Sequence, residues 1–292
     1  MTLAVWWIAC LIWSSVWLFI KIGLRDLPPV TFAAVRLAVA VAVFLPILLA
    51  RRVALPRRAD WQVIAVAGLL LLGVNYALLF WGAQYIPSGL TAVLSAITPA
   101  FALVFGHFML DDEPFSLRAL GAIALGVAGV AWISSDQLHA AGRQALLGCA
   151  AVTAATACVA FAYVYVKARG GRRVAPEVLS CGQMLCAVGP MLAFGAIREG
   201  NPFALHWTPA AIGCLLYLAL AGSVAATWLN YWLLERMSAT ALLSMALVEP
   251  LIAVVLGAIF LHERITLGAA AGGVLVLCSI FMITIVFQRS PA

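Results

Sequence analysis

The stretch that decides the fold is residues 12–46, IWSSVWLFIKIGLRDLPPVTFAAVRLAVAVAVFLP, because a weaker copy of it returns later in the chain. The copy spans residues 158–190 and has the sequence CVAFAYVYVKARGGRRVAPEVLSCGQMLCAVGP. At offsets of 146 and 147 the copies align aromatic, basic, proline and polar positions: Trp17 with Tyr163, Lys21 with Lys167, Pro29 with Pro176, and Arg36 with Gln183.

A second pair of segments repeats in the same order. Residues 90–113, LTAVLSAITPAFALVFGHFMLDDE, match residues 241–263, ALLSMALVEPLIAVVLGAIFLHE. The offset is 151, with one residue dropped before the last match: Pro99 with Pro250, Gly106 with Gly257, Leu110 with Leu261, and Glu113 with Glu263. Two apolar halves could look alike by chance, but chance would not preserve the order. The pattern predicts two repeats, residues 1–137 and 138–292.

Composition places these repeats in a membrane. The chain is 65% hydrophobic and 10% charged, unlike a soluble domain of 292 residues. Since a span needs roughly 20 apolar residues, we expect ten spans, at 3–23, 29–50, 62–84, 88–110, 116–135, 145–166, 175–197, 208–232, 239–261 and 266–287. The first lacks the basic leader and cleavage site of a signal peptide, so we interpret it as a retained helix.

Five spans per half is an odd number, so the second half enters the bilayer from the opposite side. The predicted fold is therefore an all-α membrane protein of ten transmembrane helices, arranged as two inverted five-helix repeats. Inverted repeats are typical of small-molecule carriers, which hold the substrate near the midplane between the copies.

The net charge of +6 follows membrane topology and not nucleic-acid binding. One set of loops holds 11 basic residues: Arg51, Arg52, Arg57, Arg58, Arg118, Lys167, Arg169, Arg172, Arg173, Arg236 and Arg289. The opposite set holds 5: Lys21, Arg25, Arg143, Arg198 and Arg264. The positive-inside rule then places both termini in the cytoplasm.

Several function classes lack their sequence signatures. The seven cysteines form no C-x-x-C pair, the four histidines have no metal-ligand spacing, and no glycine-rich phosphate loop is present. No constellation for an intramembrane enzyme occurs, so we expect no cofactor, no metal and no enzymatic activity. Gly268 and Gly272 form a small-xxx-small face, which favours tight helix packing or a dimer contact. We expect a monomer or a weak homodimer.

Candidate substrate-binding residues begin with an aromatic stripe on the first span. Trp13 and Trp17 lie deep in that span and either face a cavity or pack on lipid; the same face carries Trp6, Cys10 and Lys21, and the sixth span matches it with Thr156, Tyr163 and Lys167. Trp6 and Trp7 lie nearer the end of the span, which favours an interfacial belt.

Prolines and amides mark the middle of four other spans. Pro99 and Pro250 each remove a helical hydrogen bond, which predicts either a hinge or a static kink. Asn75-Tyr76 and Asn230-Tyr231 sit 155 residues apart in the third and eighth spans. A mid-span asparagine indicates either an interhelical hydrogen bond or a cavity wall.

Charged groups within spans give the sharpest hypotheses. Glu249 is the carboxylate deep in a span, and its repeat partner is Thr98. It could bind a substrate amine, carry a proton, or steady a helix break at Pro250. Arg36 could pair with a substrate carboxylate or snorkel to the interface, and Lys21 and Lys167 carry the same ambiguity.

We therefore predict a cavity between the halves, lined by spans one, three, four, six, eight and nine. The predicted substrate-binding residues are Trp13, Trp17, Asn75, Tyr76, Ser95, Thr98, Tyr163, Asn230, Tyr231, Ser244 and Glu249. The expected partners are a small-molecule substrate and the lipid bilayer.

The segment WSSVWLFIKIGLRDLPP at 13–29, followed by Arg36, and the two P…L…E endings at 99–113 and 250–263 resemble the drug/metabolite transporter superfamily, in its ten-span EamA-type branch. The resemblance covers nearly the whole chain, and within the branch the chain is most similar to bacterial aromatic amino acid exporters of the YddG type. It implies alternating access and efflux across the bacterial inner membrane. The first span lacks the glutamate of the four-span multidrug exporters. The expected function is export of amino acids or related small metabolites, aromatic ones favoured; the alternative is a proton-coupled multidrug exporter.

Overall fold

A computed structural model describes residues 2–289 apart from 59, 111–116, 170–173, 235 and 237–244. Within those residues the chain is helical throughout and contains no strand. The helices form ten segments in the positions that the apolar runs predict, so the expected ten-helix membrane fold is confirmed.

Each half has five segments; two are interrupted in the first half and one, the eighth segment, in the described part of the second. The first half contains α1 (Thr2–Gly23), α2 (Pro29–Ala50), a third segment of α3 (Asp60–Gly68), η1 (Leu69–Val74) and α4 (Asn75–Ala83), a fourth of α5 (Ser88–Ser95) and α6 (Thr98–Met109), and α7 (Leu117–Ala141). The second contains α8 (Arg143–Ala168), α9 (Pro176–Arg198), an eighth segment of α10 (Pro209–Ala219), η4 (Leu220–Ala225) and α11 (Ala226–Leu234), then α13 (Met245–Leu261) and α14 (Leu267–Arg289).

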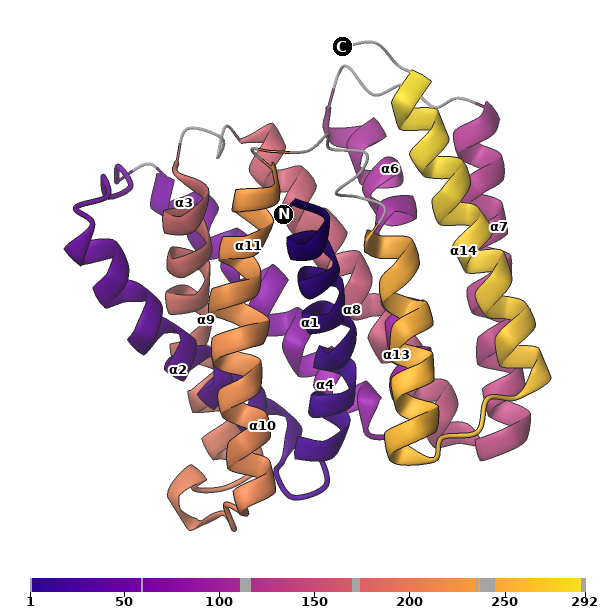
Figure 1. Ribbon diagram of the computed structural model, residues 1–292, viewed down its shortest axis with the longest axis horizontal. Coiled ribbons are helices and arrows are strands. Elements are labelled where there is room, and N and C mark those ends of the chain that lie inside the picture. Colours follow the sequence, from indigo (N-terminus) through magenta and orange to yellow (C-terminus); the bar gives the residue numbers. More distant parts are fainter. Residues whose placement is uncertain are drawn as a thin grey trace.

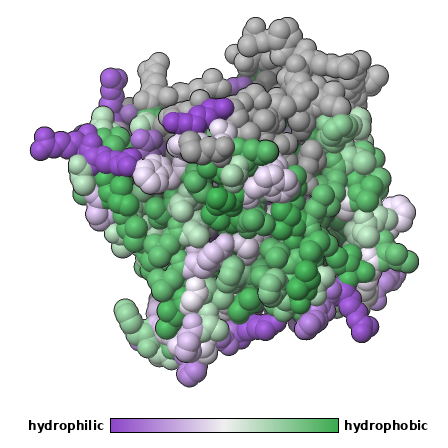
Figure 2. Space-filling model, viewed as in Figure 1, coloured by the Kyte–Doolittle hydropathy of each residue, from purple (hydrophilic) through white to green (hydrophobic). Residues whose placement is uncertain are grey.

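The outer surface is that of a membrane protein. A belt of apolar residues crosses the middle of the visible face, and polar residues gather at the two ends of that face (Figure 2). Among the described residues, 6 helical segments are long and apolar enough to cross a bilayer, and four others carry shorter apolar helices. A soluble protein rarely exposes so large a contiguous apolar area, so the belt faces lipid.

Proline fixes where several helices begin. Pro29, Pro176 and Pro209 each occupy the first turn, where the missing N–H costs nothing. The residues before them are extended, as steric contact with a proline ring favours. These starts lie within one residue of the predicted ones.

The junction between the halves differs from the prediction. The polar stretch 134–141 continues α7 to Ala141, so the fifth segment runs six residues beyond its predicted end at 135. The turn falls at Gly142, whose φ of 82° suits glycine. The boundary expected between residues 137 and 138 therefore lies inside α7.

The third and eighth segments carry a π-helical turn at matching positions of the two repeats. η1 and η4 begin 151 residues apart, the offset that also relates Pro99 to Pro250. A π-turn widens the helix and is often found at functional sites. In this register Asn75 matches Ala226, so Asn230 lies one helical turn beyond the true counterpart of Asn75.

The helices pack as a bundle with two flanking pairs. α7 and α14 lie together at one side, α2 and α9 pack at the other, and α1 and α8 occupy the centre (Figure 1). A Cβ placed on Gly272 would lie 2.8 Å from the carbonyl oxygen of Gly129 on α7, so these glycines let α7 and α14 approach closely. Of the two alternatives predicted for this face, Gly272 therefore fits tight helix packing within the chain.

We call the end of the bundle where α1 begins and α14 ends the terminus end (Figure 1). The opposite end, formed by residues 24–28, 84–87, 199–208 and 262–266, is the far end. Ten crossings bring both termini to one end.

Candidate functional site

A cavity of about 310 Å³ lies between the two halves, near the middle of the bundle. Both halves line it, often with positions related by the internal repeat: Leu71 and Gly222, Leu72 and Ser223, Trp17 and Tyr163, and Arg36 and Gln183. The predicted location between the halves agrees with this arrangement. Spans two and seven also contribute, through Arg36, Ser180, Gln183 and Met184, which the predicted set of six spans left out.

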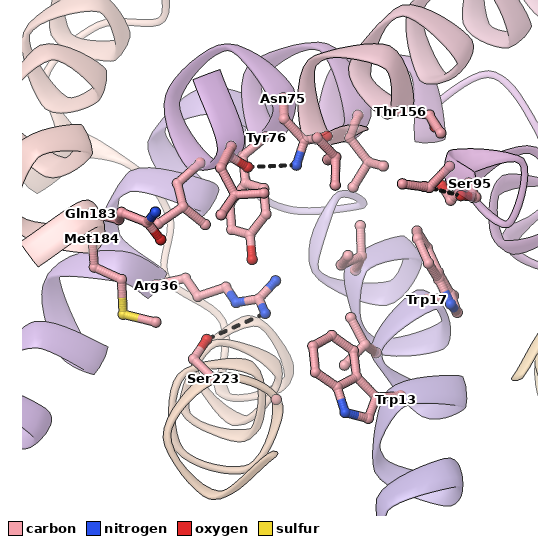
Figure 3. Close-up of a pocket in the computed structure, with 18 of the residues that line it drawn as sticks. Trp13, Trp17, Arg36, Asn75, Tyr76, Ser95, Thr156, Gln183, Met184 and Ser223 are labelled. Atoms are coloured by element: carbon pink, nitrogen blue, oxygen red, sulfur yellow. Dashed lines mark hydrogen bonds between the residues drawn. The ribbon is translucent and has the colours of Figure 1, made fainter. Parts of the chain in front are cut away.

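The first helix presents a tryptophan face to the cavity. Trp13 and Trp17 line it from α1, and Figure 3 shows both rings on the same side of the space. Tyr163 lines its edge and is 60% exposed, near the part of α8 that leads to the terminus end. Trp6 is only 7% exposed and packs with Cys10, Leu233 and Met245, so the lipid belt predicted for it is wrong, whereas Trp7 is 46% exposed.

Arg36 brings a positive charge to the cavity wall. It sits on α2 and is 3% exposed, so the predicted alternative of snorkelling to the interface is wrong. Its Nη2 donates to Ser223 Oγ at 3.3 Å, and its guanidinium carbon lies 5.1 Å from the centre of the Tyr76 ring. Its Nε has no hydrogen-bond partner among the described residues.

The π-turn of the third segment places Asn75 and Tyr76 in the same wall. Asn75 is 6% exposed, and its amide donates to the carbonyl of Leu71 at 2.8 Å, within its own helix. The predicted alternative of an interhelical hydrogen bond is therefore not seen for Asn75 among the described residues, where the amide bonds within its own segment. Tyr76 directs its hydroxyl toward the space beside Arg36 (Figure 3). Both predicted residues thus line the cavity.

The fourth segment breaks beside the cavity at Ala96-Ile97. Pro99 lacks the N–H that would bond to the carbonyl of Ser95, and the Thr98 hydroxyl donates to that carbonyl instead, at 2.7 Å. The Ser95 hydroxyl is buried without a partner among the described residues. A second cavity of about 200 Å³ continues behind Trp17, Ser95 and Thr98 toward Pro99.

Glu249 lines both cavities from α13. No described residue donates a hydrogen bond to its carboxylate or forms an ion pair with it. The break predicted at Pro250 is absent, since α13 runs unbroken from Met245 to Leu261. The two halves therefore differ: the first has a broken helix and a threonine, the second a continuous helix and a carboxylate.

Other predicted residues fall elsewhere. Lys21 donates to the carbonyls of Ala83, Gln84 and Ile86 at 2.7–3.0 Å, so it neutralises the end of α4 and does not line the cavity. The side chains of Asn230 and Tyr231, and the whole of Ser244, lie outside the described residues. Within those residues, no group of three His, Cys, Asp or Glu side chains could hold a metal.

The far end is closed by hydrogen bonds between the halves. Glu199 accepts from the backbone N–H groups of Val30 and Thr31, at 2.9 and 2.7 Å, and so caps α2. Glu263 accepts from the N–H and hydroxyl of Ser88 at 2.8–2.9 Å, capping α5. Tyr163, which lines the cavity and is 60% exposed, lies in the half of α8 that leads to the terminus end.

Known proteins with similar sequences indicate the family of this chain. The sequence profile of the EamA-like transporter family matches residues 2–135 and again 146–285. The uncharacterized transporter YoaV of Bacillus subtilis (strain 168) is 28% identical over 96% of this chain and 95% of its own length. The uncharacterized inner membrane transporter YedA of Escherichia coli (strain K12) is 32% identical over 85% of this chain and 78% of its own length. One solved crystal structure, at 19% identity, covers 99% of this chain and 98% of its own chain with a TM-score of 0.64, a likeness that shows the fold alone.

Proposed function

Because this chain belongs to the EamA-like transporter family, we propose that it exports amino acids or related small metabolites, aromatic amino acids favoured, by alternating access. It is a multi-pass membrane transporter and not an enzyme. The relative YedA is described as an inner membrane protein, which supports the inner membrane as the location. The 11-to-5 split of basic residues supports cytoplasmic termini.

One observation carries the proposal: the described wall of the central cavity holds one cation, Arg36, and one carboxylate, Glu249, and no other charged side chain. An α-amino acid carries the complementary pair of charges. Trp13, Trp17 and Tyr76 supply flat apolar surfaces with polar tips, which suit an aromatic side chain. A volume of about 310 Å³ lies at the low end for ligand pockets, typically about 300–1,000 Å³.

Counterflow in liposomes tests the function. Vesicles loaded with unlabelled phenylalanine should accumulate labelled phenylalanine, tyrosine or tryptophan faster than protein-free vesicles. Labelled lysine and aspartate should accumulate less, because each adds a charge that the apolar wall does not match. Equal uptake of all five amino acids would contradict the aromatic preference, and uptake of none would contradict amino acid export.

Glu249 favours the alternative function, a proton-coupled multidrug exporter. Its carboxylate faces both cavities without a donor among the described residues, as a proton carrier would. The same vesicles, given a pH gradient and a planar cationic dye, distinguish the two functions. Dye movement driven by the gradient, without amino acid counterflow, would favour the drug exporter.

A further inference from the structure

We infer that Arg36, held by Ser223 and Tyr76, is a carboxylate subsite that decides which solutes the cavity accepts. The inference rests on the proposed function and deepens it, because it names the chemical group that a substrate must carry. It also separates amino acids from aromatic amines, which the Glu249 side of the cavity alone would not distinguish.

Arg36 is a buried cation without a compensating anion among the described residues. Arg36 is 3% exposed and forms no ion pair with a described carboxylate. The hydrogen bond and ring contact that its guanidinium makes with described residues are to one hydroxyl and one aromatic ring, which orient a guanidinium but do not neutralise it. Removing an ion from water costs several kcal/mol unless an opposite charge compensates. A substrate anion in the cavity would supply the missing charge.

Ser223 holds the Arg36 guanidinium in a fixed position. Ser223 lies on the π-turn η4, and its hydroxyl donates to the carbonyl of Leu218 at 3.1 Å, five residues earlier. Its oxygen is thereby oriented to accept from Arg36. The neighbouring Gly222 leaves room: a Cβ there would lie 3.5 Å from Arg36 Nη2 and 3.0 Å from Val16 Cγ2.

The Arg36 guanidinium is directed into the cavity. In Figure 3 the guanidinium extends between Tyr76 and Ser223 toward the space in front of Trp13 and Trp17. Ser95 lies across that space and, like Glu249, contributes to both cavities. A solute bound by its carboxylate at Arg36 would thus reach the tryptophans with its side chain and the Ser95 side with its amine.

The charge count favours a carboxylate over a phosphate. The forked N–H groups of arginine match two carboxylate oxygens. A phosphate ester would bring a charge of about −1.5 to −2 at neutral pH. One arginine would then face both that charge and Glu249 in the same cavity. A single negative charge is the better match.

The test measures binding to the purified full chain in lipid nanodiscs. The ligands are phenylalanine, phenethylamine, which lacks the carboxylate, 3-phenylpropionate, which lacks the amine, and phenyl phosphate. Arg36→Gln should weaken both carboxylates about 30-fold or more, the usual result when one partner of a buried charge pair is removed. It should leave phenethylamine unchanged. The matched control is Arg51→Gln, the same change at the end of the same helix, where the arginine stacks on Trp228.

A second measurement separates binding from folding. Without ligand, Arg36→Gln should keep or raise the melting temperature, because it removes an uncompensated buried charge; a clear fall would assign Arg36 a structural role and overturn the inference. So would an equal effect on amine and carboxylate, tighter binding of phenyl phosphate than of 3-phenylpropionate, or wild-type protein that binds neither carboxylate. Arg36-dependent binding of 3-phenylpropionate without phenylalanine binding would refute amino acid export and leave the subsite intact. Phenylalanine binding that is unchanged by Arg36→Gln would refute the subsite and leave amino acid export intact.

Discussion

The hydroxyl of Thr98 donates to the carbonyl of Ser95, 2.7 Å away, which Pro99 leaves without its helical partner. At the repeat offset of 151, the same three positions in the second half are Glu249, Ala246 and Pro250. An ionised carboxylate cannot donate to a carbonyl, but a protonated one can. The first half therefore has a permanent hydroxyl donor at this position, beside the cavity, whereas the second half has a donor there only in the protonated form of Glu249.

Removing the Thr98 hydroxyl should destabilise the protein. Thr98→Val keeps the shape but leaves the Ser95 carbonyl unbonded, at a cost of about 1–3 kcal/mol. We expect a lower melting temperature in detergent, whereas Thr98→Ser, which keeps the donor, should stay near wild type. A valine variant as stable as the serine variant would show that water satisfies the carbonyl.

Changing Glu249 should affect transport more than folding, because no described residue pairs with its carboxylate and α13 is unbroken at Pro250. Glu249→Gln should abolish pH-driven uptake in proteoliposomes and retain exchange, with an unchanged folded yield. Glu249→Leu should also fold. A nearly silent glutamine variant together with a poorly folded leucine variant would instead assign Glu249 a structural role.

Much of this arrangement could be predicted from the sequence, because apolar run length and proline position fix where membrane helices begin and end. Repeat alignment and mid-span polarity located eight of the eleven predicted substrate-binding residues on the cavity wall: Trp13, Trp17, Asn75, Tyr76, Ser95, Thr98, Tyr163 and Glu249. The other three lie where no side chain is described.

Arg36 shows why the remainder could not be predicted. A long cationic side chain near the end of a span reaches either the interface or the interior, and hydropathy does not distinguish the two. Its alignment with Gln183 was the available signal, since both partners line the cavity. The π-turns η1 and η4 have no clear sequence signature, although they place Asn75 and Ser223. The polar end of α7 was not predicted either. The prediction followed the apolar run, whereas the helix continues beyond that run to Ala141.

The positive-inside rule predicts that both termini face the cytoplasm. A fluorescent reporter that matures only in the cytoplasm, fused after Ala292, should be bright, and alkaline phosphatase at the same site should be inactive. Phosphatase inserted after Gly142, in the turn between α7 and α8, is the matched control and should be active. The opposite pattern would invert the predicted topology.

Trp17 should control affinity for aromatic solutes, because its ring lines both cavities. Trp17→Ala should weaken binding of phenylalanine about tenfold, a typical loss for a buried aromatic anchor, while Trp17→Phe should retain most of it. Trp7→Ala is the control, since Trp7 lies on the same helix and is 46% exposed. Equal losses for Trp7→Ala and Trp17→Ala would indicate damage to α1 and not to the binding surface.

The hydrogen bonds from Ser88 to Glu263 should hold the far end closed. The site is built closely: a Cβ on Gly257 would lie 2.8 Å from Ser88 Oγ and would collide with the Glu263 carboxylate. Loss of a helix cap costs about 1 kcal/mol, so Glu263→Ala should raise the fraction of molecules open at the far end by about fivefold.

Thiol labelling from the far side measures that fraction. Ile20 lines the cavity and is 2% exposed in this structure. In a background without native cysteines, Ile20→Cys therefore places a buried thiol on the cavity wall. A membrane-impermeant maleimide should label it several times faster when Glu263→Ala is added, and Gly257→Ala should act in the same direction. The neighbouring change Arg264→Ala should not, because it leaves the cap on α5 intact. Equal labelling rates in all four proteins would mean that the Glu263 cap does not control access from this side.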